Sequence, residues 1–414
     1  MLDNPFTSKT YTSIWTKHFN EEKPPIHFKF IKNVQFYKHK LLPFYVNIGK
    51  NLTKGIDYKL NVSADDYKGK VFFIYDVPTY FNLEEFKVTN NSSLRLKKLF
   101  QYQGFLMDIS TFENQDDYIN AQFSSKNRRE FKSNKRRLET SFNIKYSFIH
   151  GSISKPEFDL LFKQFYDLLN KRFQGKQTNY HHLKGVKWNF YKVLVFEMLL
   201  EKKASMLVIY SDKNPIGITL NFHAKDVLFE TITVFDPDYY KFSIGKTSII
   251  KLLEWCFENN YKISDFSKGD FDYKRKWSNH SYNFDYHVLY DVNSIKARLI
   301  AKFSITFFKI KLYLRKKKVN NLYRKYLFKI KGGKAVSKHN SNYITEKLPN
   351  FTLSNAFKLI DYNKNDYRFL LEPIYTFLFA SQEPLSNIKV YQNKLKSNVY
   401  IISGTKGSTK IEFN

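Results

Sequence analysis

The chain has 414 residues with a formal net charge of +30, and 43% of its residues are apolar. That apolar fraction supplies a sizeable core and excludes a wholly disordered protein, while the single cysteine, Cys256, excludes an internal disulfide and a cysteine-rich zinc site. The positive charge favours polyanions such as nucleic acid or anionic lipid as partners, although a general compositional bias towards lysine explains it equally well.

Residues 1–120 are predicted to mix short strands with polar turns. Continuous apolar runs at 71–75 and 105–109 indicate buried strands. No catalytic signature is visible in this part of the sequence.

A basic helix is predicted next, over Ser124–Thr140, with Phe131 and Leu138 on a narrow apolar stripe. The segment includes Arg128 and Arg129, and arginine suits bidentate binding of phosphate or carboxylate. We interpret the helix as a platform for an anionic substrate. The alternative is an ordinary solvated face.

Two further helices are expected at Pro156–Phe173 and Val193–Leu200, where apolar residues recur at helical spacing. The polar segment between them holds His181 and His182. Because no third ligand stands at metal spacing, we expect no metal site and interpret the two histidines as substrate-lining or exposed.

A regular run of strands is predicted at 206–210, 216–222 and 227–235, followed by a loop and a helix that ends at Asn259. A short buried strand is expected at 261–266, and a final one at 284–290. The order of this part is therefore three strands, a helix, a strand, a loop and a strand.

The start of that helix is a candidate anion site. The run Gly245-Lys246-Thr247 is like the end of a phosphate-binding P-loop, but Tyr240 stands where the upstream glycine is required, so nucleotide hydrolysis is excluded. Free N–H groups at a helix N-terminus bind phosphate, and here Gly245 permits close approach while Lys246 adds charge. The alternative is that Ser243 and Thr247 merely cap the helix.

The segment from Val292 to Thr345 has no acidic residue and fifteen lysines or arginines. An apolar stripe at helical spacing is formed by Leu299, Phe303, Phe307, Ile310 and Leu314. A second helical piece is expected at Val319–Ile330. Three interpretations stay open: attachment to an anionic membrane surface, contact with RNA, and a helix docked on the protein body by its apolar side. The last segment is predicted to be a small α+β unit with strands at 367–371 and 398–402.

Three pieces of the sequence together resemble the GNAT-fold acyltransferases related to FemAB and to the CelD-type acetyltransferases of polysaccharide-producing bacteria. They are the basic segment Ser124–Leu138, the segment Tyr240–Gly245, and the stretch Asp265–Trp277, which carries Asp265-Phe266, Gly269-Asp270, Tyr273-Lys274 and Trp277. The likeness covers about residues 100–290, and Ser243-Ile244-Gly245 stands where the family usually has Ser-Pro-Gly.

The resemblance implies an α+β GNAT fold with two tandem GNAT-like halves. It suggests four parts: a degenerate N-terminal half over 1–120, a GNAT-like acyltransferase domain over 121–291, a basic amphipathic helical segment over 292–333, and a small α+β appendage over 334–414. It also implies an acyl-CoA or aminoacyl donor and an amine acceptor.

Acyl transfer to an amine needs a base, and an acid for the leaving thiolate. In the stretch Asp265–Trp277 we assign Asp270 as base or acceptor-binding group, Tyr273 as acid, and Lys274 as ion partner or donor-phosphate contact. The structural alternative is that Asp270 pairs with a neighbouring cation and that Tyr273 and Trp277 only hold the loop.

Glu230 is a second candidate base. We place it on the same strand face as Leu228, Ile232 and Val234, where desolvation would raise its pKa. The alternative is an ion pair with a lysine of the neighbouring strand. Asp265, a third candidate, is expected to act as a cap at the end of its strand.

Binding residues follow from the same resemblance. Donor contacts are assigned to Phe242, Ser243, Ile244, Gly245, Lys246, Thr247 and Lys274. Acceptor contacts are assigned to Arg128, Arg129, Gly269 and Trp277. No metal is expected.

The leading functional hypothesis is an N-acyltransferase that moves an acyl group, in the first instance acetyl from acetyl-CoA, to an amine on an amino sugar or cell-surface polysaccharide precursor. The alternatives are a FemAB-like transferase that uses aminoacyl-tRNA, and a non-catalytic protein that binds RNA or a membrane surface on a GNAT fold. Residues 1–13 lack a signal-peptide pattern and no run of about 18 apolar residues exists, so we expect a cytoplasmic protein with optional attachment to the inner membrane face.

Overall fold

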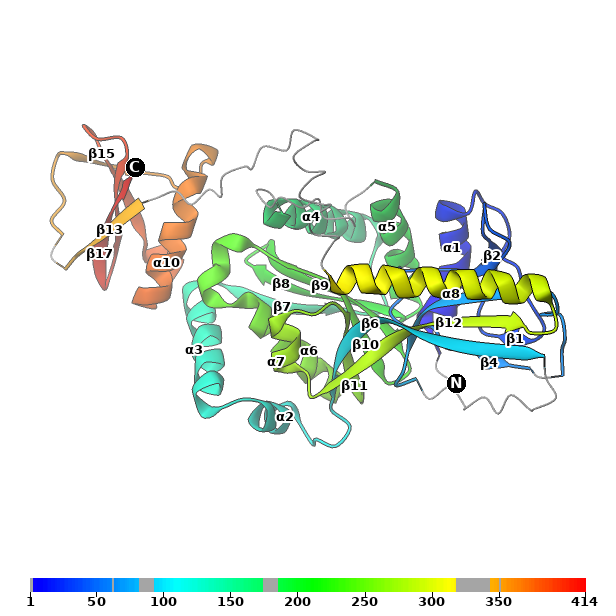
Figure 1. Cartoon of the computed structure of the whole chain (residues 1–414). Helices are drawn as coiled ribbons and strands as arrows, with labels where there is room; N and C mark the ends of the chain where they lie inside the picture. Colours follow the sequence, from blue (N-terminus) through cyan, green and yellow to red (C-terminus); the bar gives the residue numbers. More distant parts are fainter. Residues whose placement is uncertain (1–2, 62, 82–92, 174–184, 318–342, 350) are drawn as a thin grey trace.

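The computed structural model describes residues 3–61, 63–81, 93–173, 185–317, 343–349 and 351–414. Within these ranges the chain forms one large sheet covered by helices and a small second sheet near the C-terminus (Figure 1). No helix in the described ranges has the length and apolarity that crossing a bilayer requires. His181, His182 and the helical piece predicted at 319–330 lie outside the described residues.

The large sheet has ten strands, and nearly all neighbours are antiparallel. In spatial order they are β2 (Phe36–Lys38), β3 (Tyr45–Asn47), β5 (Val71–Pro78), β12 (His280–Asp291), β6 (Leu94–Asp108), β11 (Ile263–Lys268), β10 (Val227–Phe235), β9 (Asn214–Ala224), β8 (Ala204–Ser211) and β7 (Ile144–Ile149). Among the described strands, only the pairs β3–β5 and β10–β11 are parallel. The sheet is thus continuous from the N-terminal part of the chain to β7.

Helices cover both faces of this sheet. One face carries α1 (Lys9–Phe19), α4 (Lys155–Phe173) and α5 (Gly185–Leu200). The other carries α2 (Gln115–Gln122), α3 (Ser125–Ser141), α6 (Ile244–Glu258) and α7 (Asp272–Trp277). The alternation of strand side chains decides which core each residue joins: Phe229 packs with the first group, and its neighbour Leu228 packs with the second.

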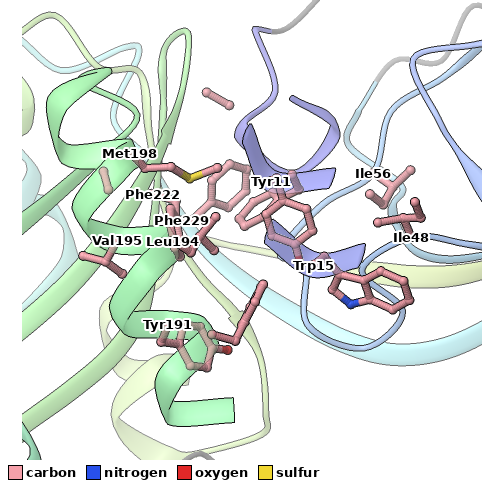
Figure 2. Packing of buried hydrophobic residues seen from close by; sticks show 14 of the residues in the cluster. Tyr11, Trp15, Ile48, Ile56, Tyr191, Leu194, Val195, Met198, Phe222 and Phe229 are labelled. Atoms are coloured by element: carbon pink, nitrogen blue, oxygen red, sulfur yellow. The ribbon is translucent and has the colours of Figure 1, made fainter. Parts of the chain in front are cut away.

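The first core binds the N-terminal segment to the middle of the chain. Figure 2 shows Tyr11 and Trp15 of α1 near the side chains that α5 contributes, among them Leu194 and Met198. The Tyr11 ring meets the ring of Phe190 edge to face at 5.9 Å. The two ends of the large sheet therefore share one continuous core rather than folding as separate units.

The structure also contains several short elements outside the two main sheets. They are the 3-10 helices η1 (Pro5–Thr7), η3 (Pro237–Phe242), η4 (Asn365–Leu370) and η5 (Leu385–Asn387), and the two-stranded pair β1 (Ile31–Lys32) and β4 (Lys59–Leu60).

The strands predicted from Met206 to Phe235 are confirmed, as are the following helix and strand. Two predicted elements were too short. β6 starts at Leu94 instead of 105, because its first half is rich in lysine and does not read as a buried run. α5 starts at Gly185 instead of Val193.

The C-terminal unit is a five-stranded antiparallel sheet with one helix. Its spatial order is β13 (Tyr343–Leu348), β17 (Gly407–Phe413), β16 (Val399–Gly404), β15 (Lys389–Asn393) and β14 (Phe357–Ile360), and its helix is α10 (Leu371–Ser381). The strand predicted at 367–371 was wrong: these residues form η4 and the first residue of α10. α10 packs on the main body, where Tyr375 meets Tyr239 at 4.6 Å between ring centroids and Arg137 donates to the carbonyl of Phe379 at 2.6 Å.

The long helix α8 (Ile295–Lys316) lies across β12, β6 and β5. The proposal that it docks by the stripe containing Leu299 and Phe303 is contradicted, since these side chains are exposed and the helix is buried through another face.

Candidate active site

The strands β10 and β11 diverge in the middle of the large sheet. Their parallel pairing ends with Phe229 opposite Asp265, although β10 continues to Phe235 and β11 to Lys268. Each strand has a β-bulge at this level, at Thr231 in β10 and at Phe266 in β11. A bulge bends its strand and interrupts regular pairing, so the backbones beyond this point do not hydrogen-bond to each other as neighbours.

Glu230 lies at the point of divergence. The residue is only 8% exposed, and its Oε1 atom has no hydrogen-bond partner among the described residues. Burial raises the pKa of Glu230 to about 8; the ammonium of Lys274 opposes this rise and the charge of Asp265 adds to it. A carboxyl group with such a pKa can exchange a proton near neutral pH, which is what a general base must do.

The bulge at Thr231 corrects the predicted orientation of Glu230. Leu228 packs in the core beneath α6, whereas Ile232 and Val234 pack in the core on the opposite face. An extra residue in a strand reverses the alternation of side chains beyond it. Glu230 therefore shares a face with Leu228 but not with Ile232 and Val234, and its charge reaches Cys256 of α6, where it helps to raise the thiol pKa.

A row of polar residues crosses the sheet beside Glu230. Asn221 of β9 is the register partner of Glu230, and Ser205 of β8 is the register partner of Asn221. Asn221 and Ser205 are fully buried, and Asn221 Nδ2 donates to Ser205 Oγ at 3.2 Å. Asn221 Oδ1, like Glu230 Oε1, has no partner within the described part of the chain. Buried polar atoms are nearly always paired, so two adjacent unpaired acceptors mark a place for a donor group.

Asp265 is the last residue of β11 that pairs with β10. Its carboxylate accepts hydrogen bonds from Tyr282 Oη at 2.6 Å, Tyr80 Oη at 2.9 Å and the backbone N–H of Ser267 at 2.6 Å. Burial raises the pKa of Asp265 to about 6, and the hydrogen bonds from Tyr282, Ser267 and Tyr80 limit the rise. These bonds hold the end of β11 and fit the expected cap.

Lys274 joins α7 to the end of β11. Its ammonium donates to the carbonyl oxygens of Phe266 at 2.7 Å and Lys268 at 2.8 Å. Burial lowers the pKa of Lys274 to about 8, while the carboxyl groups of Asp265 and Glu230 oppose this change. The ammonium is thus engaged by the protein and electrostatically coupled to both carboxyl groups, which favours the predicted role of ion partner over that of phosphate contact.

Two further lysines converge on the same place. Lys268 Nζ donates to the carbonyl of Asn51 at 3.0 Å and lies 3.7 Å from the carboxylate of Asp76. The pKa of Lys54 falls to about 7, because the group is buried and the charges of Lys268 and Lys274 lie near it. Asp76 is itself fully buried.

Sequence reasoning missed Lys54, Asp76 and Asn221. Asp76 directly follows a predicted buried strand, a position that could have drawn attention to it. Asn221 interrupts an apolar strand, and an amide on a buried position is also a usable signal. Lys54 lies in a polar turn far away in the sequence and carries no such signal.

The residues assigned around Asp270 lie mainly at the surface. Asp270 is exposed and forms an ion pair with Arg275, which also binds Asp272. The ring of Tyr273 is about half exposed and stacks on Phe271. The structure thus gives Asp270 the ion pair that was its alternative interpretation, and the catalytic roles of Asp270 and Tyr273 stay predictions.

Trp277 and Gly269 have structural positions. Trp277 is buried, with its ring stacked on Phe131 at 5.4 Å and edge-on to Phe123 at 4.6 Å, so it ties α7 to α3. Gly269 has a φ of 113°, a backbone conformation that residues with a Cβ atom rarely adopt.

The N-terminus of α6 lies just beyond β10. Ser243 has a left-handed backbone with φ of 54°, and it makes no side-chain cap hydrogen bond to the helix. A Cβ on Gly245 would stand 2.9 Å from the ring of Phe235, so glycine keeps this end of the helix close to β10. Lys246 pairs with Glu130 at 2.6 Å. These residues fit a bound anion, because the helix end has no side-chain cap and is positively polarised.

The other residues assigned to ligand binding serve packing or local bonds. Phe242, Ile244 and Thr247 point into the core. Arg128 donates to the carbonyl of Phe123 at 2.7 Å, and Arg129 donates to the carbonyl of Ser125 at 3.4 Å. Their roles in binding stay predictions. No cluster of three or more metal-ligating side chains is found in the described ranges.

Comparison with known proteins gives one family match. Residues 125–275 match a family model described as acetyltransferase (GNAT) domain. No sequence among curated proteins matches this chain significantly.

Several solved structures are similar to the chain at low identity. One is a conserved protein of unknown function from Bacteroides thetaiotaomicron VPI-5482, with 10% identity, a TM-score of 0.42, and coverage of 69% of this chain and 91% of that chain. Another is FemX, with 11% identity, a TM-score of 0.42, and coverage of 61% and 83%. A third is the C-terminal domain of a putative lysylphosphatidylglycerol synthetase from Agrobacterium fabrum, with 10% identity, a TM-score of 0.41, and coverage of 67% and 87%.

The family match runs from the first residue of α3 through β7 to β11 and into α7, and so contains Glu230, the divergent strands and the N-terminus of α6. The large sheet continues beyond β11 into a second half made of β6, β12, β5, β3 and β2. The predicted α+β GNAT fold is confirmed for residues 125–275, which carry the GNAT domain match.

Proposed function

We propose that this protein transfers an acyl group from acyl-CoA to an amine, and that the reaction takes place where β10 and β11 diverge. The observation that carries the proposal is the buried carboxyl group of Glu230 at that point, on the same face as α6, with an Oε1 atom that has no hydrogen-bond partner among the described residues. Burying a carboxyl oxygen without a hydrogen bond lowers the stability of the folded state, so the presence of such a group favours a functional role.

The donor side is supported by the N-terminus of α6. Its N–H groups, which no side chain caps, suit the pyrophosphate of coenzyme A. The backbone groups of β10 and β11 that no longer pair with each other suit the extended amide-bearing arm of the same molecule. The acetyl group is the simplest donor consistent with the family match.

The acceptor side is supported by Glu230 and Asn221. A primary amine placed between them would donate hydrogen bonds to Glu230 Oε1 and Asn221 Oδ1, the two acceptors without partners in the described residues. In its ionised form Glu230 takes a proton from the ammonium form of the substrate. The neutral nitrogen then attacks the thioester carbonyl. As the carbon–sulfur bond breaks, the nitrogen gives up its second proton, and the leaving thiolate takes up a proton, so that amide and free thiol are formed.

The lysines at the end of β11 bear on the class of acceptor. Lys54, Lys268 and Lys274 face two ionisable carboxyl groups, Asp76 and Asp265, besides Glu230. The three ammonium groups would attract an acceptor that carries a phosphate or carboxylate near its amine, most strongly while Glu230 is protonated. A phosphate-linked amino sugar, as in a precursor of cell-surface polysaccharide, has this chemistry.

A second candidate is a transferase that uses aminoacyl-tRNA as donor. The observation in its favour is the net charge of +30, which suits a nucleic acid. The two candidates differ in the donor that binds the free protein.

The test is a thermal-shift titration with acetyl-CoA, followed by a panel of amines in which free coenzyme A is detected as thiol. We expect acetyl-CoA to raise the melting temperature, and coenzyme A to be released with an acceptor of the phosphorylated amino-sugar class. Stabilisation by an aminoacyl-tRNA with none by acetyl-CoA would overturn the first candidate in favour of the second. Stabilisation by neither would overturn both.

A further inference from the structure

The helix α8 is attached to the sheet by a narrow face of mainly small side chains. Ala297, Ala301, Ser304 and Phe308 are buried, and the Phe308 ring stacks on Tyr286 of β12 with a centroid distance of 4.5 Å. This buried face packs the helix against the sheet.

The side of α8 turned away from the sheet is strongly apolar. Six large hydrocarbon side chains on it are between 42% and 69% exposed, beside the exposed Tyr313: Ile295, Leu299, Phe303, Phe307, Ile310 and Leu314. Their spacing of three or four residues places them in one continuous stripe, about 28 Å long at 1.5 Å per residue. We call these six residues the apolar stripe. An exposed apolar strip of this length is unusual on a water-soluble surface and marks an interaction site.

Cations follow one edge of the apolar stripe. Arg298, Lys302, Lys309 and Lys316 recur at intervals of four and seven residues, which keeps them between the buried face and the stripe. None of the four takes part in an ion pair with another described residue. The helix contains no acidic residue at all.

From this arrangement we propose that α8 binds the surface of an anionic lipid bilayer, with the apolar stripe inserted among the acyl chains and the four cations at the level of the headgroups. Long basic side chains can lie along an apolar surface and still keep their charge at the polar interface. An anionic surface potential attracts each of these cations.

Two other occupants fit less well. Single-stranded RNA would stack on aromatic rings, but four of the six stripe residues are aliphatic and offer no ring face. A second copy packed stripe to stripe would bring two rows of like cations together, which is unfavourable without intervening anions. A bilayer is the occupant that matches both the aliphatic surface and the charge.

Hydrogen bonds connect the end of α8 to the candidate site, so a bilayer bound to α8 would lie near that site. Arg315, near the end of α8, donates to the carbonyl of Gln101, and Gln101 Nε2 donates to Asp76 at 2.9 Å. Asp76 is the carboxylate near Lys268. The lipid-binding proposal stands apart from the acyl-transfer reaction, since it needs only the exposed face of α8.

The test is co-sedimentation of the full chain with vesicles of two compositions: equal parts phosphatidylglycerol and phosphatidylcholine, and phosphatidylcholine alone. We expect binding to the mixed vesicles and little to the neutral ones. The double variant Phe303→Ser/Phe307→Ser is expected to weaken vesicle binding by about tenfold or more. The triple variant Arg298→Gln/Lys302→Gln/Lys309→Gln is expected to weaken it by about a hundredfold.

The matched control is Leu395→Ser, which removes an exposed leucine from the C-terminal unit and should leave vesicle binding unchanged. Unfolding temperatures of all variants serve as a second measurement. If the double serine variant keeps its vesicle binding, the proposal is wrong. It is also wrong if that variant unfolds several degrees earlier or turns a dimer into a monomer, since the stripe is then covered by protein. Binding of single-stranded RNA that depends on the stripe, without binding to vesicles, would contradict it as well.

Discussion

Glu230 and Asn221 are direct neighbours across β10 and β9, and each presents a buried oxygen atom that has no hydrogen-bond partner among the described residues. Beyond Glu230, the β-bulge at Thr231 reverses the alternation of side chains, so Ile232 and Val234 lie on the opposite face of the sheet. The pair of Glu230 and Asn221 gives the proposed reaction both a proton acceptor and a group that orients the amine.

Replacing Asn221 tests its part in amine binding. We expect Asn221→Ala to raise the KM for the amine by about tenfold, because one hydrogen bond to the acceptor is lost, with acetyl-CoA affinity unchanged. Thr219→Val is the matched control, since Thr219 lies two residues away on the same strand and already bonds to Ser248 at 3.0 Å. Steady-state kinetics with the amine varied provide the measurement, and equal KM values for Asn221→Ala and the wild type would speak against the role.

The raised pKa of Glu230 also affects folding. Between the usual glutamate value of 4.5 and the folded value of about 8 the folded state holds a proton that the unfolded state releases. The contribution of Glu230 to the free energy of unfolding is therefore most favourable below pH 4.5, and it decreases as the pH rises through this window. We expect Glu230→Gln to be more stable than the wild type by a few kcal/mol at about pH 9 and by much less at about pH 5, measured by urea unfolding. A gap between the two proteins that does not grow with pH would show that Glu230 is not buried and protonated in this way.

Gly245 provides a test of the donor site. Its substitution by alanine would push the ring of Phe235, since the new Cβ would stand 2.9 Å from it. We expect Gly245→Ala to weaken acetyl-CoA binding by about tenfold in a calorimetric titration, because the helix end is displaced from β10. The control is Gly185→Ala at the start of α5, where a Cβ would meet no atom within 4 Å. If Gly245→Ala and Gly185→Ala bound acetyl-CoA with equal affinity, the donor would not bind at the N-terminus of α6.

The stretch from Asp265 to Trp277 separates structural from chemical roles. We expect Asp270→Asn to keep its activity within about threefold, because an exposed ion pair contributes little. Trp277→Ala should instead lower the free energy of unfolding by about 3 kcal/mol or more, through loss of its contacts with Phe123 and Phe131. Denaturant unfolding and a rate measurement on both variants check this. A loss of activity of a hundredfold or more in Asp270→Asn would restore Asp270 as a catalytic residue.

Much of this fold could be predicted from local sequence patterns. The strands from Met206 to Phe235 and the helix after them have regular apolar spacing and clear turns, so their bounds came out nearly right. The strand predicted at 367–371 failed because a short run in which all residues but Arg368 are apolar or aromatic fits a strand and a helix equally well. In the structure this run forms η4 and leads into α10.

The site was harder to predict than the fold. No local pattern signals a single extra residue such as Thr231, and yet this bulge moves Ile232 and Val234 to the face opposite Glu230. The convergence of Lys54, Lys268 and Lys274 depends on a loop brought in from the far end of the sequence. For α8 the spacing identified the apolar stripe, but only the packing of Ala297 and Phe308 showed that the stripe faces outward.

The most direct test of the proposed reaction is the pH dependence of kcat/KM for acetyl transfer in the wild type and in Glu230→Gln. Because the base must be ionised, we predict that the wild-type rate rises with pH to a plateau, with an apparent pKa of about 8. Glu230→Gln should lose this step and react about a hundredfold to ten-thousandfold more slowly on the plateau. A variant that retains the wild-type rate and the same pH profile would contradict the assignment of Glu230 as the base.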